Sequence, residues 1–379
     1  MRVIHLVSNP VWGGGERFVL DLSTSLIADG HDVTVVTRPV DAVRDPFVKA
    51  SLPVVTMPLS EKFGGAFDFT SPRRLARMLT DTTAYGQPVV VHVHNFGMAR
   101  LAVAARKRSA RPELVKVVCT RHLVRPAKTS SRYQRLYGEL DAIIFVSHKA
   151  RETFLSTNPN IPYGRLTVVH NSVRLPQGLK KLKKSEQSTF SKSSDCSDTL
   201  SPLRLLFAGR LAPEKGVDVL FKALARIKQL PWTLTLCGTG DPDYVTRLRD
   251  MSRSLGIDSR VDFTGHLADM FPVIDSHDLG VLPTIVAEAC PMSVIECMSR
   301  GVPVVATSNG GQAEYLHDGA DSMLIPPGDS AALAEAIAKL IDDRKLLASL
   351  SANALTTFDS SLSYPIFYQR IIDIYTNLI

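Results

Sequence analysis

The chain alternates short apolar runs, rich in β-branched residues, with segments of helical periodicity, and it does so twice. Near-continuous apolar runs predict strands of a parallel sheet that helices cover on both faces. In the first half we expect strands at 3–8, 32–37, 88–94, 114–120 and 142–147. In the second half we expect them at 203–209, 232–238, 260–265, 279–284 and 302–307. The repetition predicts an α/β chain with two doubly wound sheets.

A polar segment separates the two halves, and 379 residues favour two domains over one. Residues 176–202 are rich in Ser and Lys, which is typical of an exposed linker or loop. We therefore expect Rossmann-like domains at 1–175 and 203–358, joined by this linker. Residues 359–379 place apolar side chains at helical spacing, which predicts a closing helix that packs back on the N-terminal domain.

Charge is distributed unevenly along the chain. Residues 1–175 carry a net charge of +11, whereas residues 203–379 carry −6. The basic segment, defined as residues 100–135, holds eleven Lys and Arg but one acid, Glu113. Such a segment favours an anionic membrane face or a phosphorylated acceptor. It lacks the interleaved aromatic residues of a nucleic-acid site, so we expect no nucleic-acid partner.

The sequence has no apolar run long enough to span a bilayer, and its start is typical of a strand and loop rather than a signal peptide. We therefore expect a cytoplasmic protein. Peripheral contact with the inner face of the cell membrane is the further hypothesis that the basic segment raises.

Two glutamates eight residues apart, in the segment EACPMSVIE, mark the first candidate site. If a helix starts near Met292, its free N-terminal amides can bind a diphosphate. Glu296, one turn into that helix, can accept hydrogen bonds from a ribose diol, and Glu288 can accept them from sugar hydroxyls. The alternative is a capping acid followed by an ordinary helix residue.

Two loops that follow predicted strands supply further candidates. Arg210 and Lys215, in AGRLAPEKG, can converge on one anion, for which a diphosphate leaving group is suited. The glycines of GGGE, at 13–16, let backbone approach a phosphate or sugar. A surface loop and a tight turn are the alternatives. The GxGxxG spacing is absent, so hydride chemistry is not favoured.

Histidines and aspartates complete the set of candidates. His94 and His122 end predicted strands, where an imidazole can donate to a sugar hydroxyl or serve a structural role. Asp241 and Asp243 form a D-x-D that would suit a metal, but they precede a helical pattern, which favours a helix cap. We predict no required metal and no other cofactor.

Together these motifs resemble the family-4 retaining glycosyltransferases of the GT-B fold, over essentially the whole chain. The resemblance is sharpest at 203–329, where GRLAPEKG, the E-x7-E pair and GVPVVATSNGGQAEYL occur in family order. It implies two Rossmann-like domains facing across a cleft. It also implies metal-independent transfer of a hexose-like sugar from a UDP- or GDP-sugar to a glycan or lipid-linked acceptor. Cell-surface polysaccharide, lipopolysaccharide or glycolipid synthesis is the implied setting.

The resemblance assigns roles to individual residues. His122 and Glu288 would be catalytic, with Glu288 at the transferred sugar. Arg210 and Lys215 would hold the donor diphosphate, and Glu296 the ribose. Further donor contacts are implied at Gly14, Gly15, Leu267, Met292 and Ser293. The chain departs from the family at Ala289, where glycine is frequent, and at Pro291, which lacks an amide donor.

Other functions share this architecture. Sugar-nucleotide epimerases and inverting GT-B enzymes are the enzymatic alternatives, although neither is expected to carry these motifs in this order. A non-catalytic partner subunit is the third alternative, but it would have no need of four polar site residues. The sequence leaves open the donor base and sugar, the acceptor, the linkage and the oligomeric state.

Overall fold

The computed structural model describes residues 1–59, 70–176, 178–179 and 201–379. These residues form two compact units: unit 1 comprises Met1–Arg174 and Tyr364–Ile379, and unit 2 comprises Leu175–Ser363. Most of the expected linker at 176–202 lies outside the described residues. Within the described ranges, no helix combines the length and apolar character that crossing a bilayer requires.

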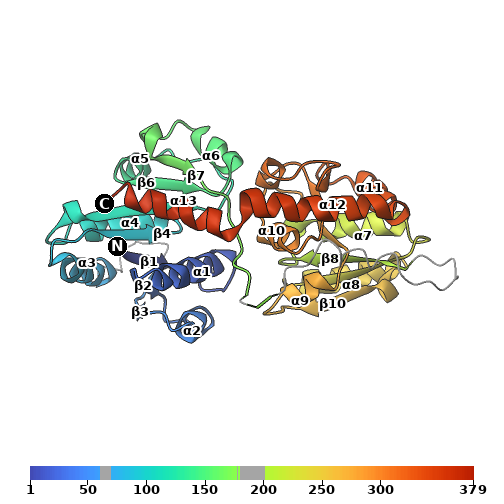
Figure 1. The fold of residues 1–379 in the computed structure, drawn as a ribbon, viewed down its shortest axis with the longest axis horizontal. Helices are drawn as coiled ribbons and strands as arrows, with labels where there is room; N and C mark the ends of the chain where they lie inside the picture. The colour runs from blue at the N-terminus through green and yellow to red at the C-terminus, as the bar shows by residue number, and fades with distance from the viewer. Residues whose placement is uncertain (60–69, 177, 180–200) are drawn as a thin grey trace. The chain divides into compact units, whose positions relative to one another are not determined.

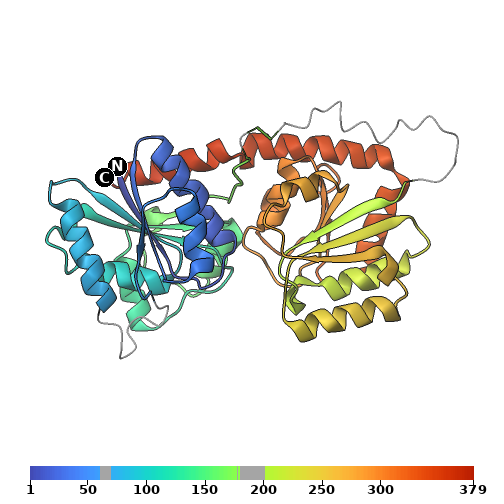
Figure 2. The same ribbon diagram turned by 90° about the horizontal axis from the view of Figure 1, so that it is seen from below.

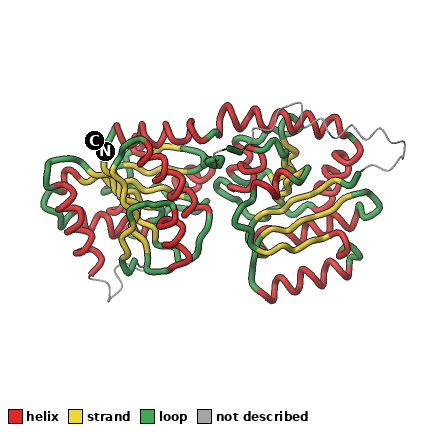
Figure 3. The backbone as a smooth tube through the Cα atoms, turned by 60° about the horizontal axis from the view of Figure 1, so that its bottom comes forward, coloured by secondary structure: helices red, strands yellow, loops and turns green. Residues whose placement is uncertain are grey.

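Unit 1 is a parallel sheet with helices on both sides (Figures 1 and 3). Its described strands have the order β3-β2-β1-β4-β5-β6-β7. The strands are β1 (Arg2–Val7), β2 (Asp32–Thr37), β3 (Val54–Thr56), β4 (Val89–Val93), β5 (Val115–Arg121), β6 (Ala142–Phe145) and β7 (Leu166–Val168). The helices are α1 (Gly14–Ala28), α2 (Asp41–Lys49), α3 (Thr70–Thr83), α4 (Phe96–Arg106), α5 (Ser131–Gly138), α6 (His148–Leu155) and α13 (Tyr364–Thr376).

Unit 2 repeats this architecture, and its described strands have the order β10-β9-β8-β11-β12-β13, all parallel. The strands are β8 (Leu203–Ala208), β9 (Trp232–Cys237), β10 (Val261–Gly265), β11 (Leu279–Leu282), β12 (Val304–Thr307) and β13 (Ser322–Ile325). The helices are α7 (Val217–Arg226), α8 (Pro242–Ser254), α9 (Phe271–Asp275), α10 (Met292–Ser299), α11 (Ser330–Asp342) and α12 (Arg344–Thr357). The prediction of two doubly wound sheets is confirmed.

Helix α13 belongs to unit 1, although all of unit 2 precedes it in the chain (Figure 2). It begins at Tyr364, after a π-helical turn at Phe358–Leu362. Its apolar face, with Phe367 and Tyr375, is buried in the same core as Phe18 of α1. Burial of large apolar side chains stabilises this docking by about 2 kcal/mol each.

Tyrosine hydroxyls also fasten α13 to unit 1. Tyr364 Oη donates to the carbonyl of Asp21 at 2.7 Å, and Tyr368 Oη donates to Asp29 Oδ2 at 2.6 Å. Both acceptors lie on α1 or at its C-terminal end. A purely apolar stripe would allow the helix to slide along its groove, whereas these directional bonds fix its register.

Candidate active site

The chain order of unit 2 creates a switch point between β8 and β11. From β8 the chain moves to β9 on one side, and β11 later pairs with β8 on the other side. In doubly wound sheets, ligands bind at the carboxyl ends of strands at such a point. The loops that follow β8 and β11 therefore form the expected binding edge of unit 2.

Hydrogen bonds hold these two loops together. The carbonyl of Glu214 accepts from Ile285 N and from Thr284 Oγ1, both at 3.0 Å. Lys215 Nζ then donates to Glu288 Oε2 at 2.8 Å. The two side chains are only 22% and 17% exposed. Two candidates 73 positions apart in the chain thus form one ion pair at the switch point.

Only one carboxylate oxygen of Glu288 takes part in the pair with Lys215. Glu288 Oε1 is buried and accepts no hydrogen bond from the described residues. Most buried acceptors in proteins are paired, so an unpaired one at a binding edge indicates a site for an external donor. A sugar hydroxyl has the required chemistry, since it donates to a carboxylate.

The loop after β12 supports the backbone of Glu288. Gly311 N donates to the carbonyl of Glu288 at 2.8 Å, and Asn309 Nδ2 donates to the carbonyl of Ile285 at 3.2 Å. A Cβ atom on Gly310 would lie 2.7 Å from the Glu288 carbonyl oxygen. We had not predicted these supporting residues individually, although SNGGQ was part of the motif. Its two glycines were the available signal, because they permit close backbone approach.

Gly216 permits a similarly close approach beside Lys215. Its φ is +69°, and a Cβ atom there would lie 2.0 Å from the carbonyl oxygen of Pro283. We predict that Gly216→Ala destabilises unit 2 by about 3 kcal/mol or more, from left-handed strain of about 1–2 kcal/mol plus the clash. Gly256→Ala is the matched control, since Gly256 has φ +66° but open space at Cβ. Chemical denaturation of both variants checks this, and equal losses would contradict the role assigned to the close approach.

Arg210 does not converge with Lys215 on one group. Its guanidinium pairs with Glu214 at 2.5 Å, and its side chain is 67% exposed. Each cation is thus held by a different carboxylate: Glu214 lies four residues after Arg210 in the same loop, whereas Lys215 faces the loop after β11. The convergence of the two cations on one anion stays a prediction.

Helix α10 begins at Met292, as the sequence indicated. Pro291 occupies its N-cap position, and the side chain of this proline makes no capping hydrogen bond. Glu296 is half-buried on this helix. Ser293 lines a cavity of about 10 Å³ beneath the helix, which has room for about one water molecule and not for a nucleotide. Leu267 is half-buried after the edge strand β10, two strands from β8.

The D-x-D forms a helix cap, as expected. Asp241 Oδ1 accepts from the backbone amides of Asp243 at 3.1 Å and Tyr244 at 3.2 Å, at the start of α8. The carboxylate of Asp241 is therefore engaged in hydrogen bonds to backbone amides.

In unit 1, four histidines gather on one face of the sheet. His5 of β1 is in register with His92 of β4, and His94 follows two residues later on the same face. His122 comes directly after β5, and its ring stacks on that of His94 with centroids 5.5 Å apart. Phe18 of α1 contacts the rings of His92, His94 and His122 edge-on. We had noted His94 and His122 separately and had not predicted the cluster.

Burial keeps these imidazoles neutral. Loss of hydration lowers the pKa of His5 to about 3, and it lowers the pKa of His122 to about 4, with a smaller contribution from the charge of Arg121. Desolvation also lowers the pKa of His92 and His94 well below the ordinary value, and neighbouring histidines add to the effect. At neutral pH His122 is therefore a neutral hydrogen-bonding group.

Ring nitrogens of His5, His92 and His94 lie within 4.8 Å of one another, which is a possible metal-ligand arrangement. Both nitrogens of His92 are already hydrogen-bonded, to Tyr375 Oη at 2.6 Å and Thr120 Oγ1 at 2.7 Å. A metal on His92 would have to displace one of these hydroxyls. The bond to Tyr375 also ties α13 to β4 of the sheet.

Gly14 and Gly15 form the first turn of α1, which begins at Gly14. A Cβ atom on Gly15 would meet nothing within 4 Å, so packing does not explain the glycine there. The open space beside this helix end suits the approach of a ligand.

Two family models match the chain in succession: one described as Glycosyltransferase Family 4 matches residues 12–176, and one described as Glycosyl transferases group 1 matches residues 202–343. The chain belongs to glycosyltransferase family 4.

Curated relatives of this family-4 glycosyltransferase differ in how far they match. Glycogen synthase of Mycobacterium tuberculosis is 27% identical over 367 residues, which is 88% of this chain and 83% of that protein. An exopolysaccharide phosphotransferase of Streptomyces coelicolor is 35% identical over 161 residues, which is 41% of this chain but only 17% of that protein.

Solved structures establish the fold of this family-4 glycosyltransferase. A glycosyltransferase from Rickettsia africae matches with a TM-score of 0.81 and 18% identity, covering 100% of this chain and 98% of that chain. Anabaena HepE, solved in complex with UDP-glucose, matches with a TM-score of 0.76 and 22% identity, covering 100% of both chains. The fold is GT-B, built from two Rossmann-like units.

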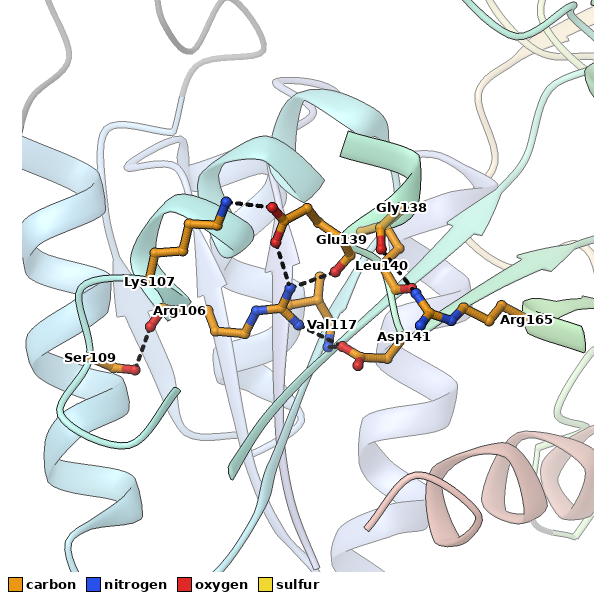
Figure 4. Close-up of polar contacts among 9 residues, drawn as sticks. All are labelled: Arg106, Lys107, Ser109, Val117, Gly138, Glu139, Leu140, Asp141 and Arg165. Atoms are coloured by element: carbon orange, nitrogen blue, oxygen red, sulfur yellow. Dashed lines mark hydrogen bonds and ion pairs between the residues drawn. The ribbon is translucent and has the colours of Figure 1, made fainter. Parts of the chain in front are cut away.

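The basic segment of this family-4 glycosyltransferase is partly neutralised by nearby acids (Figure 4). Arg106 pairs with Asp141 at 2.8 Å and with Glu139 at 3.3 Å. Lys107 pairs with Glu139 at 2.5 Å. These acids follow the segment in the chain, so the charge count of the segment alone overstated its available positive charge. Basic side chains remain exposed around α5, at Arg125, Lys128, Arg132 and Arg135.

Proposed function

We propose that the protein transfers a sugar, with retention of configuration, from a nucleoside diphosphate sugar to an acceptor. The observation that carries this proposal is the Lys215–Glu288 pair at the switch point, where Glu288 Oε1 is buried and has no hydrogen-bond partner within the described part of the chain. Family membership supports sugar transfer, and the HepE complex with UDP-glucose supports a nucleotide-sugar donor. We assign the donor to unit 2 as a UDP- or GDP-sugar.

In this proposal each side chain contacts a specific group of the donor. Lys215 moves its ammonium group toward the diphosphate, whose negative charge grows as the bond to the sugar breaks. Glu288 accepts hydrogen bonds from hydroxyls of the transferred sugar, and Glu296 accepts them from the ribose. Arg210, Leu267 and the amides of Met292 and Ser293 complete the donor contacts in unit 2, and Gly14 and Gly15 contribute them from unit 1.

His122 of unit 1 donates a hydrogen bond to the transferred sugar as a neutral imidazole. Departure of the diphosphate and attack of the acceptor occur on one face of the sugar, so no protein nucleophile is needed. The cations and amides supply the leaving-group stabilisation that a metal ion provides in other enzymes, which is why we propose a metal-independent reaction.

A thermal-shift panel with UDP, GDP and ADP tests donor binding. A ligand that binds only the folded state raises the melting temperature, and at 100 times its Kd it stabilises by about 2.7 kcal/mol. We expect UDP or GDP to give the largest shift. The matching sugar donor is then incubated with acceptor extracts, and NMR of the product gives its anomeric configuration. Inversion would contradict retention, and conversion of the sugar nucleotide without acceptor would indicate an epimerase.

We further propose that the enzyme works at the cytoplasmic face of the cell membrane on a glycan or lipid-linked acceptor of cell-envelope synthesis. The exposed basic side chains around α5 support this, and Leu123 beside them is 49% exposed. Attraction to anionic lipid contributes about 1 kcal/mol for each Lys or Arg near the surface.

Replacing Arg125, Lys128 and Arg132 together by glutamine should weaken binding to anionic vesicles about 100-fold, because three such charges contribute about 3 kcal/mol. The matched control replaces Arg247, Arg249 and Arg253 on α8, which are also exposed. Vesicle sedimentation at several salt concentrations measures both variants. Equal weakening, or binding that does not depend on anionic lipid, would rule out this surface.

A further inference from the structure

His94 contacts His122 directly, at the point where unit 1 would present an imidazole to the sugar. His94 Nδ1 lies 3.3 Å from His122 Nε2, so one of the two nitrogens donates and the other accepts. Both imidazoles are neutral, because burial lowers the pKa of each well below its ordinary value. Either of the two nitrogens can therefore carry the proton of this hydrogen bond.

The other nitrogen of His94 distinguishes the two arrangements. His94 Nε2 is buried and has no hydrogen-bond partner among the described residues. If it carried the proton, it would be an unpaired buried N–H, which proteins rarely contain. If Nδ1 carries the proton, Nε2 is an unpaired acceptor, which is less rare, and Nδ1 donates to His122.

The surroundings of His94 leave little freedom to its ring. Phe18 packs edge-on against both imidazoles, with centroids 5.4 Å from each. The His5 ring stacks on His94 with centroids 5.7 Å apart. Rotation of His94 would need these neighbours to move, so its Nδ1 stays directed at His122.

We propose that His94 is a positioning residue that donates from Nδ1 to His122 Nε2 and so holds the proton of His122 on its Nδ1. This inference rests on the proposed sugar transfer only for its consequence, since a proton on Nδ1 makes His122 a hydrogen-bond donor to the sugar rather than an acceptor. Fixing the tautomer of a catalytic imidazole by a second polar group is an effective use of such a contact.

Two substitutions at His94 separate positioning from packing. Asparagine at position 94 places an N–H close to the location of Nδ1, whereas leucine fills the space without a donor. We expect His94→Leu to lower kcat about tenfold or more with little change in KM, and His94→Asn to recover most of the loss. Thermal unfolding of both variants reports whether the fold is retained.

Nitrogen-15 NMR of the histidine rings gives an independent readout, with the His122 signals identified by their loss in His122→Gln. We expect Nδ1 protonation of His122 in the wild type and in His94→Asn, and a mixture of tautomers in His94→Leu. Nε2 protonation of His122 in the wild type would overturn the proposal, as would an unchanged tautomer in His94→Leu. If sugar transfer itself were absent, the NMR result would still decide the tautomer.

Discussion

Replacing Lys215 by alanine should lower kcat/KM for sugar transfer by about 10²–10³-fold, the usual effect of removing one group that stabilises developing negative charge. Among the described residues, the ammonium group at the switch point pairs with Glu288, and it is positioned to exchange that carboxylate for a diphosphate. Glu288→Gln should also reduce transfer, because a neutral amide is a weaker acceptor for sugar hydroxyls. Steady-state kinetics with the preferred donor measures both effects.

Stability has to be separated from chemistry in these variants. Loss of Lys215 leaves a poorly hydrated carboxylate at Glu288, which destabilises the fold, whereas the double variant Lys215→Ala/Glu288→Gln removes that charge. Lys222→Ala is the matched control, since Lys222 is an exposed lysine on α7 that pairs with Asp218. We expect Lys222→Ala to retain activity. Wild-type rates in a folded Lys215→Ala protein would exclude the assigned role.

Mild acid should unfold unit 1 before unit 2. The four clustered histidines stay neutral when folded but take up protons near their ordinary pKa of about 6.5 when unfolded. The unfolded state thus binds more protons, so stability falls as pH decreases below about 6.5 and continues to fall until the folded pKa values are reached. Unit 2 has one histidine whose pKa is similarly lowered by burial, His277.

The expected size of this acid effect is large. At pH 5 a histidine with a folded pKa of about 3 or 4 costs about 2 kcal/mol, so His5 and His122 together cost about 4 kcal/mol, and His92 and His94 act in the same direction. A whole domain is stable by about 5–15 kcal/mol. Glu16 and Asp21 act in the opposite sense, because burial raises their pKa: as pH falls through the raised values toward the ordinary 4.5 and 3.8, they offset part of the histidine effect.

The two tryptophans report the units separately, since Trp12 lies in unit 1 and Trp232 in unit 2. Acid titration of Trp12→Phe and Trp232→Phe variants by fluorescence should show unit 1 unfolding at the higher pH. His5→Leu should shift that transition to lower pH, because it removes a buried imidazole with two unpartnered nitrogens. Coincident transitions of both units, unaffected by His5→Leu, would contradict the prediction.

Periodicity predicted the central strands and the edge strand β10, but it failed at the three shorter edge strands. Strands such as β2 and β8 are apolar runs of six residues buried between helices, so their pattern is visible in the sequence. The sequence did not reveal β3, β7 and β13, which have three or four residues and lie at the ends of their sheets. An edge strand is partly exposed and short, so its composition differs little from that of a loop.

The donor-side roles stay predictions, but the contact between Lys215 and Glu288 could be anticipated because each residue follows a predicted strand. Lys215 and Glu288 could be proposed as one site once β8 and β11 were placed as central strands. The histidine cluster was not predictable in this way, because the contact of His5 with His92 depends on the pairing of β1 with β4 and on its register. Arg210 shows a further limit of prediction from sequence. A motif does not specify which carboxylate the Arg210 side chain pairs with, and in the structure it pairs with Glu214.

The place of α13 has a consequence for biosynthesis. A ribosome delivers residues 175–363 before Tyr364–Thr376, so unit 2 is available to fold while unit 1 still lacks a helix. During that interval the groove beside α1 is uncovered, and His92 lacks its tyrosine partner. A nonsense mutation shortly before codon 364 would therefore remove α13 from the first-made unit while leaving all of unit 2 in place.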